Sequence, residues 1–427
     1  MLSKKYKNDL DKLINIAQNY REGTISNSLF IDVLSSQQNF EENIELCKEY
    51  LEANDILVVD DDEVEEIADE VNYTELIKPY DTTQIDISPK PLSLDMIISR
   101  LENEEIDLMP DFQRKAGLWS PEQKSQLIES LLLRIPLPAF YFDGSNNSKW
   151  VVIDGLQRLT ALKEFFVAEN EKDKLKLQGL EFLKELNGTT IDDMPRSYVR
   201  RMKETQVITY IINPGAPINL KYNIFKRINT GGLKLEAQEI RHALYQGFAA
   251  RYLKELANLE EFKQATGYSI KTDRMLDREF VLRFLTFYNL GVSEYKGSID
   301  LFLNAGMELL NRKEFEEVDA EYLREKFVRV LNVNREIFGK FAFRRMPDLV
   351  KRRPISKALF ETWTCVLAEY TEDELEFLVK QKKNLIAKCS VMCLEDEEFI
   401  DSIGSGKVSS VKKRFEKIVN LVKEMMK

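Results

Sequence analysis

The chain has 427 residues and a formal net charge of -11 at pH 7, with 44% apolar and 31% charged residues. This length and apolar content suffice for about two or three packed domains, whereas an acidic chain is poorly suited to binding nucleic acid over its whole surface. No segment approaches the ~18 to 20 apolar residues of a membrane span, and the first residues lack the apolar core of a secretory signal. We therefore expect a cytoplasmic protein that does not enter a membrane.

Histidine and cysteine usage narrows the possible chemistry further. The sequence holds one histidine, His242. A single histidine excludes zinc sites with two histidines and His-Asn-His-type nuclease folds. The four cysteines are too scattered for a disulfide framework. Cys389 and Cys393 have no second cysteine pair and no nearby histidine, so we expect buried helix residues rather than zinc ligands.

Residues 1–71 are expected to form a small helical module with an acidic end. Apolar periodicity predicts three helical elements, and residues 54–59 predict a short strand. Residues 60–70 are strongly acidic. This order is similar to the inhibitory N-terminal region of primary bacterial sigma factors, which implies a docking or autoinhibitory module that imitates nucleic-acid charge. The alternative is that the acidic run is only a solvated surface.

The next segment carries two clear helix start signals. Residues 72–92 contain three prolines among polar residues, which predicts a linker. Ser93 is expected to cap the helix that follows it. A second helix should begin at Pro121, because Ser120 can act as its cap and Gln123 completes a capping box.

The central motif of the chain lies where a predicted strand, residues 149–153, turns at Asp154-Gly155 and continues as a helix. The first N–H groups of such a helix lack partners and lie at the positive end of its dipole, which suits an anion. Arg158 could grip a phosphate there, and the alternative is a capped helix with a surface arginine. Asp154 could hold Mg²⁺ or cap the helix, and we expect capping.

The remaining elements change from mixed to helical along the chain. A strand over residues 138–142 precedes the central motif, and a charged insertion over 169–195 follows it. Another strand is predicted over 207–212. Beyond about residue 250 the sequence predicts helices only, and the helix over 279–288 is apolar on nearly all sides and should be buried.

Three blocks in a fixed order carry a family resemblance: residues 110–114, residues 153–158, and residues 225–232 with 239–244. Together they resemble the N-terminal domain of GmrSD-type restriction enzymes, whose core looks like the ParB/sulfiredoxin fold. The resemblance spans about residues 91–250 and continues more weakly at 278–288 and 404–415. It implies an α+β protein with a helical module at 1–71, a linker at 72–92, a ParB-like nucleotide-binding domain at 93–250 and a helical domain at 251–427.

The resemblance also implies a pocket for a nucleoside triphosphate, with Mg²⁺ as the accompanying ion. It leaves open whether the triphosphate is hydrolysed; hydrolysis would depend on Asp154, Gln157 and Arg158. The usual motif reads Asp-Gly-Gln-Gln-Arg, and the replacement of its first glutamine by Leu156 weakens any claim of hydrolysis. The implied binding residues are Gln113, Arg114, Asp154, Gly155, Gln157, Arg158, Arg227, Asn229, Thr230 and Arg241. For the last four, the alternative is helix-end chemistry and one salt bridge between helices.

Two functions remain open. The first is a nucleotide-binding component that recognises DNA or regulates a prokaryotic or phage defence system, with a partner subunit supplying the nuclease. The second is a protein-interaction scaffold with a degenerate pocket. Two basic clusters, at 196–203 and 344–353, could contact DNA phosphates or pair with the acidic segment at 60–70. The helical half could also form a homodimer.

Overall fold

The computed structural model of the chain divides into two compact units. One unit comprises Met1–Leu76 with Tyr245–Lys427, and the other comprises Ile77–Leu244. None of the described helices combines the length and the apolar character needed to cross a membrane. The described residues are 4–20, 23–34, 37, 40–60, 64–65, 87–108, 119–146, 148–170, 172–212, 217–228, 235–272, 274–312, 315 and 317–427.

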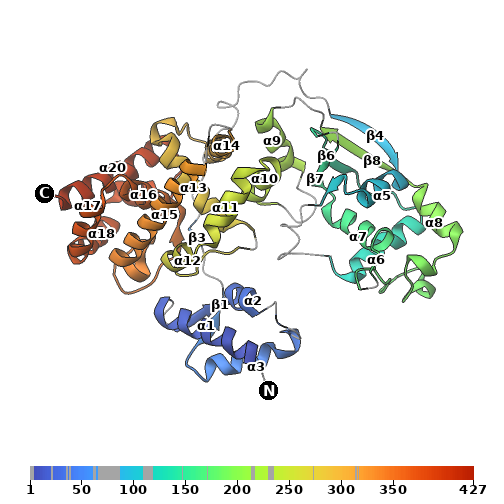
Figure 1. Cartoon of the computed structure of the whole chain (residues 1–427), viewed down its shortest axis with the longest axis horizontal. Coiled ribbons are helices and arrows are strands. Elements are labelled where there is room, and N and C mark those ends of the chain that lie inside the picture. Colours follow the sequence, from blue (N-terminus) through green and yellow to red (C-terminus); the bar gives the residue numbers. More distant parts are fainter. Residues whose placement is uncertain are drawn as a thin grey trace. The chain divides into compact units, whose positions relative to one another are not determined.

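The Ile77–Leu244 unit is built on a five-stranded mixed sheet with the order β4-β8-β6-β7-β5. β4 (Ile87–Ser93) pairs antiparallel with β8 (Gln206–Ile212), as Figure 1 shows at the upper edge of this unit. β8 runs parallel to β6 (Phe140–Asp143). β7 (Trp150–Asp154) is antiparallel to β6 and parallel to the short strand β5 (Ile106–Asp107).

Helices cover both faces of this sheet, because successive strand residues point to opposite sides. On one face, Phe140, Phe142 and Val152 belong to a core shared with four helices. On the other face, Val151 and Ile153 pack with two helices. This layered α and β arrangement confirms the mixed fold class. The first face carries α5 (Leu94–Glu102), α6 (Pro121–Leu132), α7 (Leu156–Phe166) and α8 (Arg196–Lys203), and the second carries α9 (Ile218–Ile228) and α10 (Ala237–Leu244).

The predicted helix starts are confirmed. The Ser93 side chain accepts a hydrogen bond from the Met96 N–H at the start of α5. At the start of α6, Ser120 and Gln123 form both halves of a capping box, and Pro121 is the first helical residue. These caps satisfy N–H groups that a helix cannot pair internally, which explains why local sequence alone predicts them.

Part of the predicted linker is a strand. Residues 87–92 belong to β4, which pairs with β8 along its whole length. Pro89 and Pro91 were part of the reason for predicting a linker, because proline lacks the N–H that a strand residue donates. Proline is nevertheless tolerated in an edge strand, and β4 lies at the edge of the sheet. Residues 72–86 lie outside the described residues.

The charged insertion at 169–195 is held to α6 by one buried carboxylate. Glu129 is 3% exposed. Its oxygens accept hydrogen bonds from the N–H groups of Glu181, Phe182 and Leu183 at 3.1, 2.8 and 2.7 Å. Burial raises the pKa of Glu129, but the three backbone donors outweigh burial and place the pKa below its ordinary value. Two short 3₁₀ helices, Lys184–Leu186 and Ile191–Asp193, lie in the same insertion.

The N-terminal module contains the three predicted helices and the predicted strand, with a small core of its own. β2 (Leu57–Val59) pairs in parallel with β1 (Thr24–Ser26). The acidic segment lies outside the described residues, except for Asp60 and β3 (Val64–Glu65), so its masking role stays a prediction. The helices are α1 (Lys4–Tyr20), α2 (Asn27–Leu34) and α3 (Phe40–Glu52).

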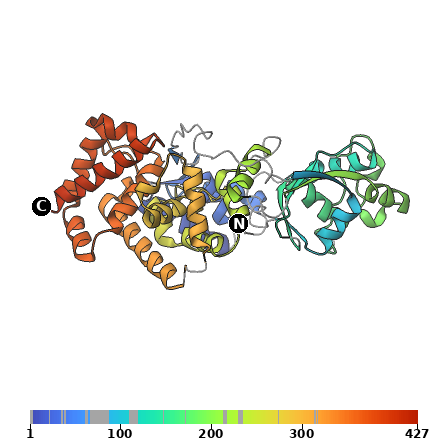
Figure 2. The same ribbon diagram turned by 90° about the horizontal axis from the view of Figure 1, so that it is seen from above.

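The elements formed by the described residues beyond 245 are helices, as predicted, apart from the short strand β9 (Ile355–Ser356), which pairs in parallel with β3. The predicted apolar helix is α13, and its residues are almost all buried. Cys389 and Cys393 are buried on α18, as expected. Figure 2 shows these helices, coloured yellow to red, packed against one another. They are α11 (Phe248–Asn258), α12 (Glu260–Thr266), α13 (Leu276–Leu290), α14 (Ile299–Leu310), α15 (Glu317–Phe338), α16 (Lys357–Ala368), α17 (Glu372–Lys380), α18 (Lys382–Glu395), α19 (Glu397–Ile403) and α20 (Val408–Met425).

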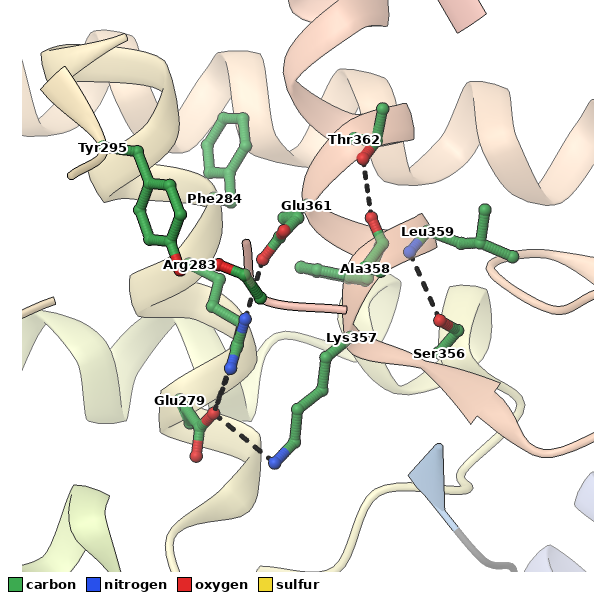
Figure 3. Close-up of polar contacts among 12 residues, drawn as sticks. Glu279, Arg283, Phe284, Tyr295, Ser356, Lys357, Ala358, Leu359, Glu361 and Thr362 are labelled. Carbon is green, nitrogen blue, oxygen red and sulfur yellow. Dashed lines mark hydrogen bonds and ion pairs between the residues drawn. The ribbon is translucent and has the colours of Figure 1, made fainter. Parts of the chain in front are cut away.

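A buried ion network ties three of these helices together. Arg283 on α13 donates to Glu361 on α16 at 2.8 Å and to Glu279 at 2.9 Å, and Lys357 lies 3.5 Å from Glu279 (Figure 3). Arg414 on α20 donates to the other oxygen of Glu361. The weaker parts of the family resemblance, at 278–288 and 404–415, therefore contribute to the core of this helical region.

Candidate functional site

The site begins at the corner between β7 and α7, where Gly155 is indispensable. Gly155 has φ of 99°, a left-handed conformation that other residues rarely adopt. A Cβ atom at this position would lie 2.5 Å from Cδ1 of Phe140. The chain can therefore pass from strand to helix against β6 only because residue 155 has no side chain.

The N-terminus of α7 has no side-chain cap among the described residues. Its N-cap is Gly155, and its first turn contains no acidic residue. The prediction that Asp154 caps this helix is therefore wrong. The cause is a closer partner: Asp154 Oδ2 accepts a hydrogen bond from Arg158 at 2.9 Å. The amides of the first turn, with the positive end of the helix dipole, form a corner that suits an anion.

Arg158 is buried and takes part in holding this corner together. It is 8% exposed. Its guanidinium donates to the carbonyl oxygens of Pro138 and Ala139, as well as to Asp154, and lies over the ring of Phe140 at 4.5 Å. Burial lowers the pKa of Arg158, and Asp154 offsets part of that effect. The arginine therefore braces the corner, instead of extending to solvent as the alternative reading expected.

The two residues between Gly155 and Arg158 have different roles. Leu156 packs against the core under the sheet, so the position that departs from the family motif turns inward. Gln157 is half-buried, and its Oε1 accepts a hydrogen bond from the Trp119 N–H at 3.1 Å. Because Trp119 directly precedes the Ser120 cap of α6, Gln157 links the starts of α6 and α7.

Beside a β-bulge, Asp154 pairs with one of two stacked tyrosines that the sequence analysis missed. Tyr141 pairs with Asp154, whereas the next residue of β6 pairs with Val152, so β7 contains one extra residue there. Tyr141 stacks on Tyr210 of β8 at 4.8 Å. Burial raises the pKa of Tyr141, and Tyr210 and Asp154 add to this effect. Period-two alternation in both strands was the signal that could have placed these tyrosines on one face.

The helices of the third block, α9 and α10, pack on the opposite face of the sheet from α7. Arg241 on α10 is buried, donates to Gln238 Oε1 at 3.2 Å and lies 5.5 Å from the ring of Tyr222. Arg227 is exposed at the end of α9. Both helices share the core that contains Ile153. The other four implied residues of these blocks, Gln113, Arg114, Asn229 and Thr230, lie outside the described residues.

A second polar cluster, not predicted from sequence, lies at the far end of β6. Lys221 on α9 contacts both carboxylate oxygens of Asp143 at 3.1 and 3.2 Å. Lys221 and Asp143 also both bond the Ser145 hydroxyl. These residues fix the start of the loop between β6 and β7, at the opposite end of β6 from Phe140, over which Arg158 lies.

The described part of the chain brings together no cluster of metal-binding side chains. No group of three or more His, Cys, Asp or Glu side chains is arranged to hold an ion there. His242, the single histidine, is buried on α10. Asp154 has one oxygen engaged by Arg158 and keeps 32% of its side chain exposed.

These features define a sheet domain whose strand-to-helix corner can receive an anion. Residues 96–246 match the family described as GmrSD restriction endonuclease, N-terminal domain. The match contains β6, β7, α7, α9 and α10 and confirms the predicted family for this part of the chain. Among curated proteins, none matches the chain. The similarity of the N-terminal module to sigma factors stays a prediction.

Proposed function

We propose that this chain is a nucleotide-binding component of a prokaryotic or phage restriction system, with a ParB-like pocket at the corner between β7 and α7. The observation that carries the proposal is the uncapped N-terminus of α7, which begins at a glycine packed against β6. Backbone N–H groups at such a terminus bind phosphate groups in many nucleotide sites. The match to a restriction endonuclease domain supports the biological setting.

Within this proposal, the α7 amides receive the phosphates and Arg158 acts as a positioning residue. Arg158 supports the helix start through Asp154 and the β6 carbonyl groups. Gln157 supplies a polar side chain beside the amides. The family resemblance also implies Gln113 and Arg114 as the rim, and Arg227, Asn229, Thr230 and Arg241 as further pocket residues. Of these, Arg241 is buried on the opposite face of the sheet from α7 and would contribute to the pocket only from that side. If hydrolysis occurs, we assign it to Asp154, Gln157 and Arg158.

Mg²⁺ fits this pocket only as an ion carried with the nucleotide. The free oxygen of Asp154 supplies one ligand, and Mg²⁺ commonly takes one or two carboxylates together with phosphate oxygens and water. The neighbouring charge of Arg158 weakens the attraction of Asp154 for a cation. We therefore expect magnesium binding to depend on the triphosphate.

The proposed component acts on DNA together with a nuclease supplied by a partner subunit. The reason is chemical: His-Asn-His-type nucleases need more than one histidine, and this sequence holds one. That histidine is buried inside α10. Such a subunit would be controlled by nucleotide, contact DNA and recruit a nuclease. This role accounts for both the restriction-type domain and the single histidine.

A second candidate function is a protein-interaction scaffold that retains the fold with an inactive pocket. Two observations favour it: Leu156 removes a polar group that the usual motif has, and the Arg158 guanidinium is already occupied by the protein. In this case no nucleotide would stabilise the chain.

Thermal melting with each of the four ribonucleoside triphosphates plus Mg²⁺ separates the two functions. Ligand at about one hundred times its dissociation constant should stabilise the native state by ~2.7 kcal/mol. Arg158→Ala should reduce this ligand-induced shift, and Glu129→Gln serves as a control because it weakens the same unit away from the corner. No shift with any nucleotide would reject the nucleotide-binding function and leave the scaffold.

A further inference from the structure

The structure separates two basic clusters that look equivalent in the sequence. In the cluster at 344–353, Arg344 is buried and donates to Thr266 O and to Ser269 Oγ. Arg352 donates to Gly267 O and to the same Ser269 hydroxyl. Arg353 pairs with Asp348 at 3.0 Å. Two guanidinium groups of this cluster therefore hold the protein's own backbone, and a third makes a partly exposed ion pair.

The cluster on α8 is arranged differently. Arg196, Arg200 and Arg201 are exposed on this helix. Met202 is fully buried in the sheet core and holds the helix in place. Arg201 lies 5.4 Å from the Tyr198 ring, a contact that orients its guanidinium without neutralising it.

Neighbouring carboxylates neutralise part of this surface only weakly. Arg200 lies 3.8 Å from Glu204, and both side chains are more than 70% exposed. Lys203 lies 3.1 Å from Asp95 on α5. Exposed pairs of this kind contribute about 0 to 1 kcal/mol, so an external anion can replace the carboxylate at little cost. Arg196 and Arg201 have no carboxylate partner among the ion pairs that join described residues.

The cations form a line beside a groove. Arg196, Arg200 and Lys203 are spaced i, i+4 and i+7, so they share one face of α8 over a length of about 10 Å. They border an open groove of about 660 Å³. Its other polar residues are Ser93, Asp95 and Glu204, and its apolar residues are Ile191, Met194 and Val199. None of the described polar residues that line the groove is buried, as a residue that grips a small ligand would be, whereas a row of cations suits a linear polyanion.

From this arrangement, we infer that α8 is the surface through which the chain contacts the phosphate backbone of duplex DNA. The inference rests on the DNA-contacting role proposed above and names the surface that carries it. Arginine suits the task because its planar fork donates two parallel hydrogen bonds to a phosphate. In a chain of net charge -11, contact with DNA requires such a local patch. These backbone contacts carry no base preference.

The test uses the full chain and a fluorescent duplex of about 20 base pairs, titrated between about 50 and about 200 mM salt. One variant, the α8 variant, combines three substitutions that remove the exposed arginines of this helix: Arg196→Gln, Arg200→Gln and Arg201→Gln. The matched control removes three exposed lysines elsewhere: Lys351→Gln, Lys382→Gln and Lys383→Gln. Both proteins lose the same net charge, and their melting curves check that both remain folded.

We expect the α8 variant to lose at least about tenfold in affinity at low salt, and its slope of log affinity against log salt to fall by about 2 to 3. The control should keep the wild-type slope. Equal losses in both variants would overturn the inference, since general charge would then explain binding. Stronger competition by a poly-glutamate peptide than by unlabelled duplex would also overturn it, because an acidic protein would be the partner.

The failure of the inference is distinguishable from failure of the proposed function. Wild-type binding that is insensitive to the α8 substitutions would reject this surface and retain a DNA-contacting role elsewhere. Absence of duplex binding, with or without triphosphate, would reject both the surface and the DNA-contacting role. The nucleotide-binding half of the proposed function is tested separately by melting.

Discussion

At the scale of single residues, the α7 corner depends on the guanidinium of Arg158. The group donates to the half-buried carboxylate of Asp154 and to two carbonyl groups that precede β6. The arginine therefore stabilises the approach to β6 as well as the start of α7.

Replacing this arginine should destabilise the fold whether or not nucleotide is present. We expect Arg158→Ala to lower the free energy of unfolding by about 2 kcal/mol, because hydrogen bonds from a charged, buried donor are lost. Urea denaturation of the ligand-free protein measures this loss. Arg227→Ala, which removes an exposed arginine of the same proposed pocket, should change stability by less than about 0.5 kcal/mol. Equal stability of the two variants would mean that Arg158 is free to serve a ligand.

Sequence predicted the residues whose partners are close in the chain and missed those whose partners are distant. Ser120 and Gln123 are three residues apart, and their capping box was predicted correctly. The acceptors of Arg158 at Pro138 and Ala139 are backbone atoms, which leave no side-chain pattern. Lys221 and Asp143 meet only because α9 folds back over β6, which no local rule anticipates.

At the scale of elements, the passage from β7 to α7 is limited by the space beside Phe140. We expect Gly155→Ala to cost about 1 to 3 kcal/mol, because the residue would need both a left-handed backbone and a Cβ in contact with the ring. Gly188→Ala provides the control, since Gly188 has φ of 87° but its nearest atom, Lys176 Cε, is 3.9 Å away. The difference between the two variants in chemical denaturation isolates the contact with Phe140. A difference near zero would contradict the steric argument.

The attachment of the 169–195 insertion to α6 should depend on pH. The pKa of Glu129 is depressed in the folded state from its ordinary value of 4.5. Its stabilising contribution is therefore complete at neutral pH and is lost as pH falls below 4.5 through the folded pKa. The Glu129→Gln variant should have a lower free energy of unfolding than wild type at neutral pH. Acidification should reduce this difference in free energy. The control is Glu102→Gln, which removes an exposed carboxylate on α5. Its free energy of unfolding should match that of wild type throughout the same denaturation series.

Element prediction failed where tertiary context overruled composition. The prolines of β4 indicated a linker, yet pairing with β8 makes this segment a strand. The tyrosines on β6 and β8 were not connected, because parallel register between strands far apart in sequence sets their contact. In contrast, the buried helix α13 was predicted well, since its apolar residues cover almost every side.

At the scale of the whole molecule, the two compact units should respond separately to mutation. Glu361 is fully buried and binds both Arg283 and Arg414, so Glu361→Gln leaves two arginines without a full charge partner. We expect it to destabilise the helical region by about 3 to 5 kcal/mol. Hydrogen exchange should show faster exchange in α13, α16 and α20 and unchanged exchange in the sheet of the Ile77–Leu244 unit.

The reciprocal variant completes this comparison. Glu129→Gln should accelerate exchange in α6 and in the insertion, and it should leave α13 and α20 unchanged. If either variant accelerates exchange in both units to the same extent, the units unfold as one cooperative body. That result would contradict the division into Met1–Leu76 with Tyr245–Lys427 and Ile77–Leu244.

The prolines of β4 have one more consequence, for the behaviour of this protein at high concentration. An open sheet edge presents N–H and C=O groups to which the strand of another molecule can add, and such addition begins aggregation. β4 forms one edge of the sheet, and two of its seven residues have no N–H to offer. Pro89 and Pro91 therefore oppose the addition of a strand from another molecule at this edge. We expect them to limit aggregation through β4.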